Sequence, residues 1–66
     1  MPLLSESVSP AERHVLQQLL RGLSNRAIAT ELTLSPRTVE SHISRMLTKT
    51  GCQNRTQLLL RALTER

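Results

Sequence analysis

Residues 24–50 read SNRAIATELTLSPRTVESHISRMLTKT, and this stretch decides the fold. Ser24 is a helix-capping residue that opens a short amphipathic segment. Ser35-Pro36 starts a new helix with a second cap and a proline at the first helical position. Because the connection over residues 33–34 is so short, the two helices must cross at a steep angle. The stretch therefore predicts a helix-turn-helix, with helices over about 25–32 and 36–50.

Two further helix starts flank this motif. Ser9-Pro10-Ala11-Glu12 has the pattern of a capping box, and Gly22 supplies a stop with positive φ. Asn54-Arg55-Thr56-Gln57 is a second capping box, and Gly51 ends the helix before it. No strand signal and no internal repeat is present. We predict an all-α fold, a four-helix domain with helices over about 10–21, 25–32, 36–50 and 55–65, preceded by a tail or linker stub at 1–8, with the domain itself at 9–66.

The predicted core is aliphatic, because the 66-residue chain contains no Phe, Tyr or Trp. Winding each segment at about 100° per residue gathers its apolar residues on one face. Cys52, just after the third helix, is interpreted as a small packing residue rather than a redox switch. The expected inward positions are Ala11, Val15, Leu16, Leu19, Leu20, Ala27, Ile28, Leu32, Val39, Ile43, Met46, Leu47, Thr50, Leu58, Leu59, Ala62 and Leu63.

The composition limits the classes of partner. Nine Lys and Arg against five Asp and Glu give a formal net charge of +4, which suits a polyanion, although many small basic domains bind no nucleic acid. A single cysteine excludes an intramolecular disulfide, and with His14 and His42 it forms no structural zinc set. We expect no cofactor, no metal, no small-molecule ligand and no membrane segment, and a cytoplasmic location.

The third helix carries the chemistry that points to function. Its side opposite the core contains no large apolar residue. Short hydroxyl side chains let a helix lie deep in the major groove, while arginines reach guanine or phosphate. The residues on this side are Arg37, Ser41, Ser44, Arg45 and Thr48.

Four spaced motifs closely resemble the LuxR-type helix-turn-helix domain over residues 8 to about 63. They are Ser9-Pro10-x-Glu12-x-x-Val15-Leu16, then Gly22-Leu23-Ser24-Asn25-Arg26-x-Ile28-Ala29, then Leu34-Ser35-x-x-Thr38-Val39-Glu40-x-His42, and Lys49-x-Gly51 with Asn54-Arg55-Thr56. Their agreement in order and spacing makes the resemblance specific. It implies the effector domain of a response-regulator or quorum-sensing type transcription factor from bacteria.

The resemblance also implies roles for individual residues. It assigns Glu40, Ser41 and Ser44 to base contacts and Thr38 and Lys49 to the phosphates. The chain departs from the family where Ala27 replaces Glu, Thr50 replaces Leu, and Glu40 and Ser44 replace the Lys of some relatives. Fewer positive charges predict weaker electrostatic binding or a different base preference. The full predicted DNA-binding set is Arg37, Thr38, Glu40, Ser41, Ser44, Arg45, Thr48, Lys49, Ser24 and Asn25.

The fourth helix is the expected dimer contact, as the resemblance implies. Leu60 projects about 100° or more away from the apolar stripe of this helix. An exposed leucine there favours pairing of two copies on DNA. The expected dimer residues are Leu60, Leu63, Thr56 and Thr64.

Two residues allow two interpretations each. Glu12 falls within the apolar face of the first helix, where it either bonds back to the cap or forms a buried pair with an arginine such as Arg55. His42 lies at the edge of an apolar stripe and serves either in packing or capping, or in a phosphate contact.

The sequence favours sequence-specific binding of double-stranded DNA in transcription regulation, as a homodimer, with RNA polymerase as a candidate partner. The alternative is a helical protein interaction module whose charge is incidental. An enzyme is not expected, because the five acidic residues are scattered and no nucleophile has a base beside it. If the chain is a fragment, a receiver or ligand-binding domain is expected before Met1; if it is complete, it acts through its own concentration.

Overall fold

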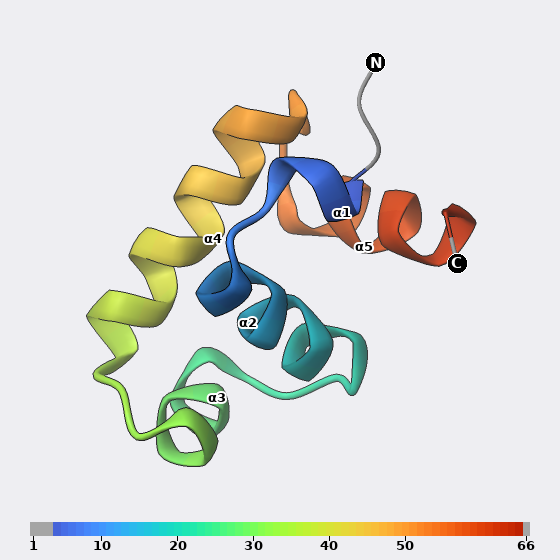
Figure 1. The fold of residues 1–66 in the computed structure, drawn as a ribbon. Coiled ribbons are helices and arrows are strands. Elements are labelled where there is room, and N and C mark those ends of the chain that lie inside the picture. The colour runs from blue at the N-terminus through green and yellow to red at the C-terminus, as the bar shows by residue number, and fades with distance from the viewer. Residues whose placement is uncertain (1–3, 66) are drawn as a thin grey trace.

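The computed structural model describes residues 4–65, and within them the fold is entirely helical (Figure 1). The four long helices confirm the predicted ones, with bounds that differ by at most one residue at the ends of the first and last. A fifth helix of one turn precedes them. The elements are α1 (Leu4–Ser7), α2 (Pro10–Leu20), α3 (Asn25–Leu32), α4 (Pro36–Thr50) and α5 (Arg55–Thr64).

The predicted caps begin the long helices. Ser9, Ser24, Ser35 and Asn54 each accept a hydrogen bond from the backbone N–H three residues later. At Ser9 the capping box is complete, because the Glu12 carboxylate accepts in return from the Ser9 N–H at 2.9 Å. The predicted box at Asn54 differs, since the Gln57 side chain accepts from the N–H of Gln53 at 2.7 Å.

A residue in the left-handed region lies just after each of α2, α3 and α4. Gly22 and Gly51 have φ of 83° and 72°, as expected for residues that stop a helix. Thr33 occupies the same region with φ 57° at the end of α3, although its side chain is β-branched. Within residues 4–65 it is the only residue other than glycine with positive φ.

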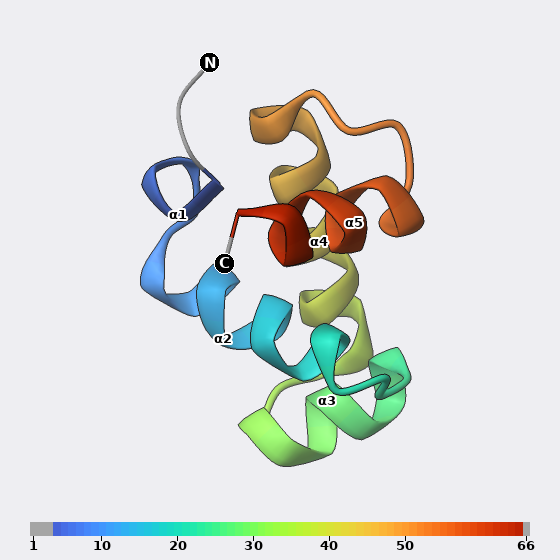
Figure 2. The same cartoon turned by 90° about the vertical axis from the view of Figure 1, so that its right-hand side faces the viewer.

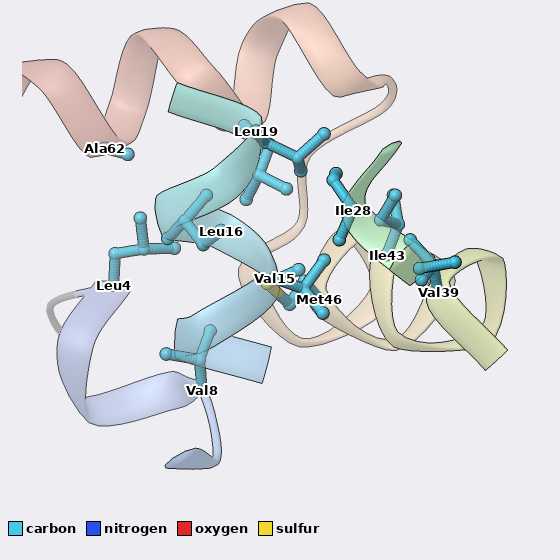
Figure 3. Close-up of a cluster of buried hydrophobic side chains, with 12 residues drawn as sticks. Leu4, Val8, Val15, Leu16, Leu19, Ile28, Val39, Ile43, Met46 and Ala62 are labelled. Carbon is cyan, nitrogen blue, oxygen red and sulfur yellow. The ribbon is translucent and has the colours of Figure 1, made fainter. Parts of the chain in front are cut away.

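The core runs between all five helices of the described residues (Figure 3). In Figure 3, Leu4, Leu16 and Ala62 lie toward one end of the cluster, and Ile28 and Val39 lie toward the other. Two expected core positions are wrong. Ala11 is exposed because it lies on the solvent side of the first turn of α2, and Leu63 is 51% exposed because α5 turns that side away from the other helices.

The expectation of a tail or linker over residues 1–8 is wrong for residues 4–8, and residues 1–3 lie outside the described part. Residues 4–7 form α1, and the side chains of Leu4 and Val8 are 4% and 8% exposed in the core. The Leu4 N–H also donates to the carboxylate of Glu65 at the end of α5. A single helical turn shows no sequence periodicity, so its burial is set by the helices against which it packs.

α4 is the central element of the packing, because it contacts each of the other four helices. It nevertheless lies along one side of the molecule, at the left in Figure 1. Figure 2 shows α5 crossing α4 on the side where α1 and α2 also lie. One face of α4 is therefore buried by the whole domain and the opposite face is free.

Candidate nucleic-acid interface

The free face of α4 contains the polar residues that the sequence analysis singled out. The opposite side of the helix buries Val39, Ile43, Met46 and Thr50. Because apolar contacts on that side fix the rotation of the helix about its axis, the polar side must point to solvent. The exposed residues of α4 among the predicted set are Arg37, Glu40, Ser41, Ser44, Arg45, Thr48 and Lys49.

The N-terminus of α4 is built from a cap and a second hydroxyl. The Ser35 Oγ accepts from the Thr38 N–H at 3.1 Å and lies 2.9 Å from the Thr38 Oγ1. Thr38 is half-buried, and its hydroxyl is engaged with the cap. The positive end of the helix dipole lies here beside the exposed Arg37.

The start of α3 is joined to the start of α5. The Arg55 guanidinium donates a hydrogen bond to the Oδ1 of Asn25, and both residues are half-buried. Ser24 caps α3, with its Oγ 3.2 Å from the Ala27 N–H. Two of the predicted DNA-binding residues, Ser24 and Asn25, therefore already make bonds that shape the helix-turn-helix.

Lys49 has a partner that the sequence analysis did not anticipate. Its Nζ lies 2.7 Å from the Oε1 of Glu12, whose side chain is 2% exposed against 41% for that of Lys49. Burial alone would raise the pKa of Glu12, but hydrogen bonds from Lys49 and the Ser9 N–H outweigh it, so this pKa lies below its ordinary value. The capping interpretation of Glu12 is confirmed, whereas the suggested pair with Arg55 is wrong, because Arg55 donates to Asn25.

A shallow hollow lies on the outer face of α4, lined by Ser44, Arg45, Thr48 and Lys49. Thr48 turns its hydroxyl back along the helix, where it donates to the Ser44 carbonyl at 3.1 Å. Ser44 and Thr48 are one helical turn apart, as are Arg45 and Lys49, so the four residues surround one small area of the helix surface.

An exposed stripe on α5 includes every predicted dimer residue. Leu60 and Leu63 are 59% and 51% exposed. Thr56 and Thr64 are exposed as well, and the Thr64 hydroxyl donates to the Leu60 carbonyl at 2.8 Å. Positions 56, 60, 63 and 64 share one side of a helix, so the stripe is continuous.

The C-terminal end of α4 is held by a cation that the sequence analysis missed. The Arg61 guanidinium donates to the Thr50 carbonyl at 2.6 Å and to the Glu65 carboxylate at 2.8 Å. Glu65 holds the pKa of Arg61 above its ordinary value, and Arg61 lowers that of Glu65. The spacing of Arg61 and Glu65, four residues apart within the predicted helix over 55–65, was the available signal.

His42 and Cys52 are both half-buried. His42 is half-buried, and its Nδ1 is buried without a hydrogen-bond partner among residues 4–65. Cys52 is half-buried against the core cluster, which confirms its interpretation as a packing residue.

Within the described residues, no three His, Cys, Asp or Glu side chains are grouped so as to hold a metal ion. None of the helices in residues 4–65 has the length and apolar character needed to cross a membrane.

The comparisons with known proteins agree on one family. The family model described as bacterial regulatory proteins, luxR family, matches residues 6–62. The response regulator Rre1 of Synechocystis is 46% identical over 55 residues, covering 83% of this chain and 24% of that protein. The putative HTH-type transcriptional regulator Mb0914c of Mycobacterium bovis is 43% identical over 53 residues, covering 80% and 6%. The transcriptional regulatory protein FixJ of Bradyrhizobium diazoefficiens is 40% identical over 57 residues, covering 86% and 28%.

The chain thus spans between 6% and 28% of the length of these three relatives. No solved structure matches the chain significantly.

Proposed function

Because the chain belongs to the luxR family of bacterial regulatory proteins and has the family's DNA-binding helix-turn-helix, we propose that α4 enters the major groove of a specific duplex. One observation carries the proposal. The helix that every other helix packs against presents a free face of short hydroxyls and arginines. Such a face matches the depth and the charge of the groove.

Base recognition is proposed for the middle of that face. Ser41 and Ser44 are short, exposed and three positions apart on the free face, so their hydroxyls would lie nearest to the base edges. Glu40 is exposed beside them and would accept a hydrogen bond from cytosine N4. This choice of residues rests on the family resemblance together with their exposure.

Phosphate binding is proposed for the residues around this centre. Arg37 at the start of α4 and Arg45 one turn past Ser41 are both exposed, so their guanidinium groups would be available to phosphates of the duplex. Thr38, Ser24 and Asn25 lie at helix N-termini, where backbone N–H groups favour phosphate oxygens. Lys49 completes the set at the C-terminal end, although its ammonium is engaged with Glu12.

Pairing of two copies is proposed through the α5 stripe. Two exposed leucines on one side of a helix favour burial against an equivalent surface. Two copies would then read two half-sites with the symmetry of the dimer. RNA polymerase is proposed as a further partner, in keeping with the regulatory family to which the chain belongs.

Selection of duplexes from a random pool tests the proposal. We expect a recovered site with two related halves and an affinity that falls with salt. Ser41→Ala or Ser44→Ala should change the recovered bases, with an effect of about 1 kcal/mol. Gln17→Ala on the exposed side of α2 is the control and should leave the site unchanged. Recovery without any common sequence, together with binding indifferent to salt, would favour the alternative of a protein interaction module.

A further inference from the structure

The hollow on the outer face of α4 has almost wholly aliphatic walls, although its four lining residues all have polar side chains. Such residues ordinarily present their polar ends to solvent. Here the polar ends of two of them are occupied elsewhere.

The hydroxyl of Thr48 is hydrogen-bonded to the backbone of its own helix. The Oγ1 donates to the Ser44 carbonyl at 3.1 Å, which leaves the methyl group of the exposed side chain for the hollow. Lys49 directs its ammonium to Glu12 of α2 at 2.7 Å, so that its methylene stem, and not its charge, borders the hollow. The result is an apolar spot within a polar and basic face.

We propose that this hollow receives the 5-methyl group of a thymine, an inference that rests on the proposed entry of α4 into the major groove. Among the groups that base pairs present in that groove, the thymine methyl is the apolar one, and threonine methyls are among its partners. Ser44 and Arg45 of the free face also line the hollow, and the exposed Arg45 would supply the charge that a neighbouring phosphate requires. Thr48 is therefore a specificity residue through its methyl group.

The experiment replaces each thymine of the selected duplex, one at a time, with uracil, which differs only by the missing methyl. At one position in each half-site, wild-type affinity should fall about fourfold, the value of one buried methyl group. Thr48→Ser keeps the hydroxyl that bonds to Ser44 but lacks the methyl, and it should no longer distinguish thymine from uracil there. Thr48→Val keeps a methyl and should still distinguish them.

Thr30→Ser is the matched control. The Thr30 hydroxyl donates to the Arg26 carbonyl at 3.1 Å in the same way, but it lies on α3. This variant should keep the full wild-type response to uracil.

The outcomes separate the two proposals. If a specific duplex is selected but no thymine position shows a response that depends on Thr48, this inference is overturned and the proposed function stands. If the chain selects no duplex, the proposed function fails and this inference fails with it.

Discussion

The ammonium of Lys49 on α4 lies 2.7 Å from the carboxylate of Glu12 on α2, and the two partners differ in exposure. Glu12 is almost completely buried at the N-terminus of its helix, whereas the Lys49 side chain is 41% exposed. The same carboxylate accepts from the Ser9 N–H and so completes the cap of α2. One buried group thus joins the start of the first long helix to the end of the helix proposed to enter the DNA groove.

The first prediction is that the two partners of this pair are not equivalent for stability. Lys49→Met leaves a buried carboxylate without its cation and should lower the free energy of unfolding by about 2–3 kcal/mol. The loss is smaller than for breaking a fully buried pair, because water reaches the Lys49 side. Glu12→Gln keeps an acceptor for the Ser9 N–H and releases an ammonium that water can solvate, so it should cost about 1 kcal/mol. Urea unfolding measures both.

The double variant Glu12→Gln, Lys49→Met should lie close to Glu12→Gln alone, because the buried charge is gone. Arg37→Met removes an exposed cation from the same helix and should change stability by less than about 0.5 kcal/mol. Equal costs for the two single variants would contradict this account of the pair.

The second prediction concerns pH. Because the pKa of Glu12 is lowered in the folded state, its ionised form contributes stability above its ordinary pKa, and this contribution is lost as the pH falls through the folded value. The difference in unfolding free energy between wild type and Glu12→Gln should therefore be full near neutral pH and shrink below about pH 4.

The cost of Lys49→Met should also shrink on acidification, and from a higher pH, because without Lys49 burial raises the pKa of Glu12 and protonation then removes the unpaired charge. Urea titrations from neutral to acid pH measure these differences, with Glu40→Gln as a control that removes an exposed carboxylate. A cost of Lys49→Met that grows on acidification would refute the proposed role of the buried charge. The lowered pKa of Glu65 acts in the same direction, so wild type should lose stability in acid even beyond the Glu12 contribution.

The elements could be predicted from the sequence because their signals are local. A hydroxyl or amide cap precedes every long helix, and the cap and the bonds it makes lie within four residues of each other. The periodicity of α4 also fixes which side is free, since burial of Val39, Ile43 and Met46 leaves one orientation.

The pairings between helices could not be predicted in this way. The position of Glu12 within an apolar face signalled an unusual carboxylate, but its partner Lys49 lies 37 residues away along the chain. The packing of the helices determines which residues pair, so that Lys49 donates to Glu12 and Arg55 donates to Asn25. The burial of Leu4 and Val8 likewise depends on tertiary contacts, and the sequence around them shows no hydrophobic periodicity that predicts it.

The third prediction concerns the turn between α3 and α4. Thr33 adopts φ 57° and ψ 46°, a region that disfavours β-branched side chains, and its own side chain is exposed. Thr33→Gly removes the steric cost and should stabilise the domain by about 0.5–1 kcal/mol, after the entropy that glycine loses on folding. Gly51→Ala is the converse test. An added Cβ would meet no atom within 4 Å, so the only cost of this substitution is the positive φ that alanine disfavours. The midpoint temperature of thermal unfolding should rise for Thr33→Gly and fall for Gly51→Ala. A lower midpoint for Thr33→Gly would show that the threonine side chain stabilises the turn by more than its backbone strain costs.

The fourth prediction concerns pairing through α5. Leu60→Glu places a charge in the exposed stripe and should leave the monomer folded, because this side chain is 59% exposed. Affinity for a duplex with two half-sites should fall by about tenfold or more, while affinity for one half-site stays unchanged. Gln17→Glu adds the same charge on the exposed side of α2 and should change neither affinity. If Leu60→Glu sediments and binds as wild type does, the α5 stripe is not the dimer contact.

The fifth prediction separates the two cations at the C-terminal end of the free face. Arg45 is exposed, so its guanidinium is available to a phosphate, whereas Lys49 has its ammonium on Glu12. Arg45→Gln should reduce the dependence of log affinity on log salt by about 0.9, the value of one phosphate contact. Lys49→Met should reduce it by clearly less, because the ammonium displaces few counterions from the duplex while it remains on the carboxylate. Binding to a non-specific duplex at several salt concentrations measures both slopes and avoids any change in base recognition. If instead Lys49→Met lowers the slope by as much as Arg45→Gln, the ammonium leaves Glu12 when the protein binds DNA, and the pair is a feature of the free domain alone.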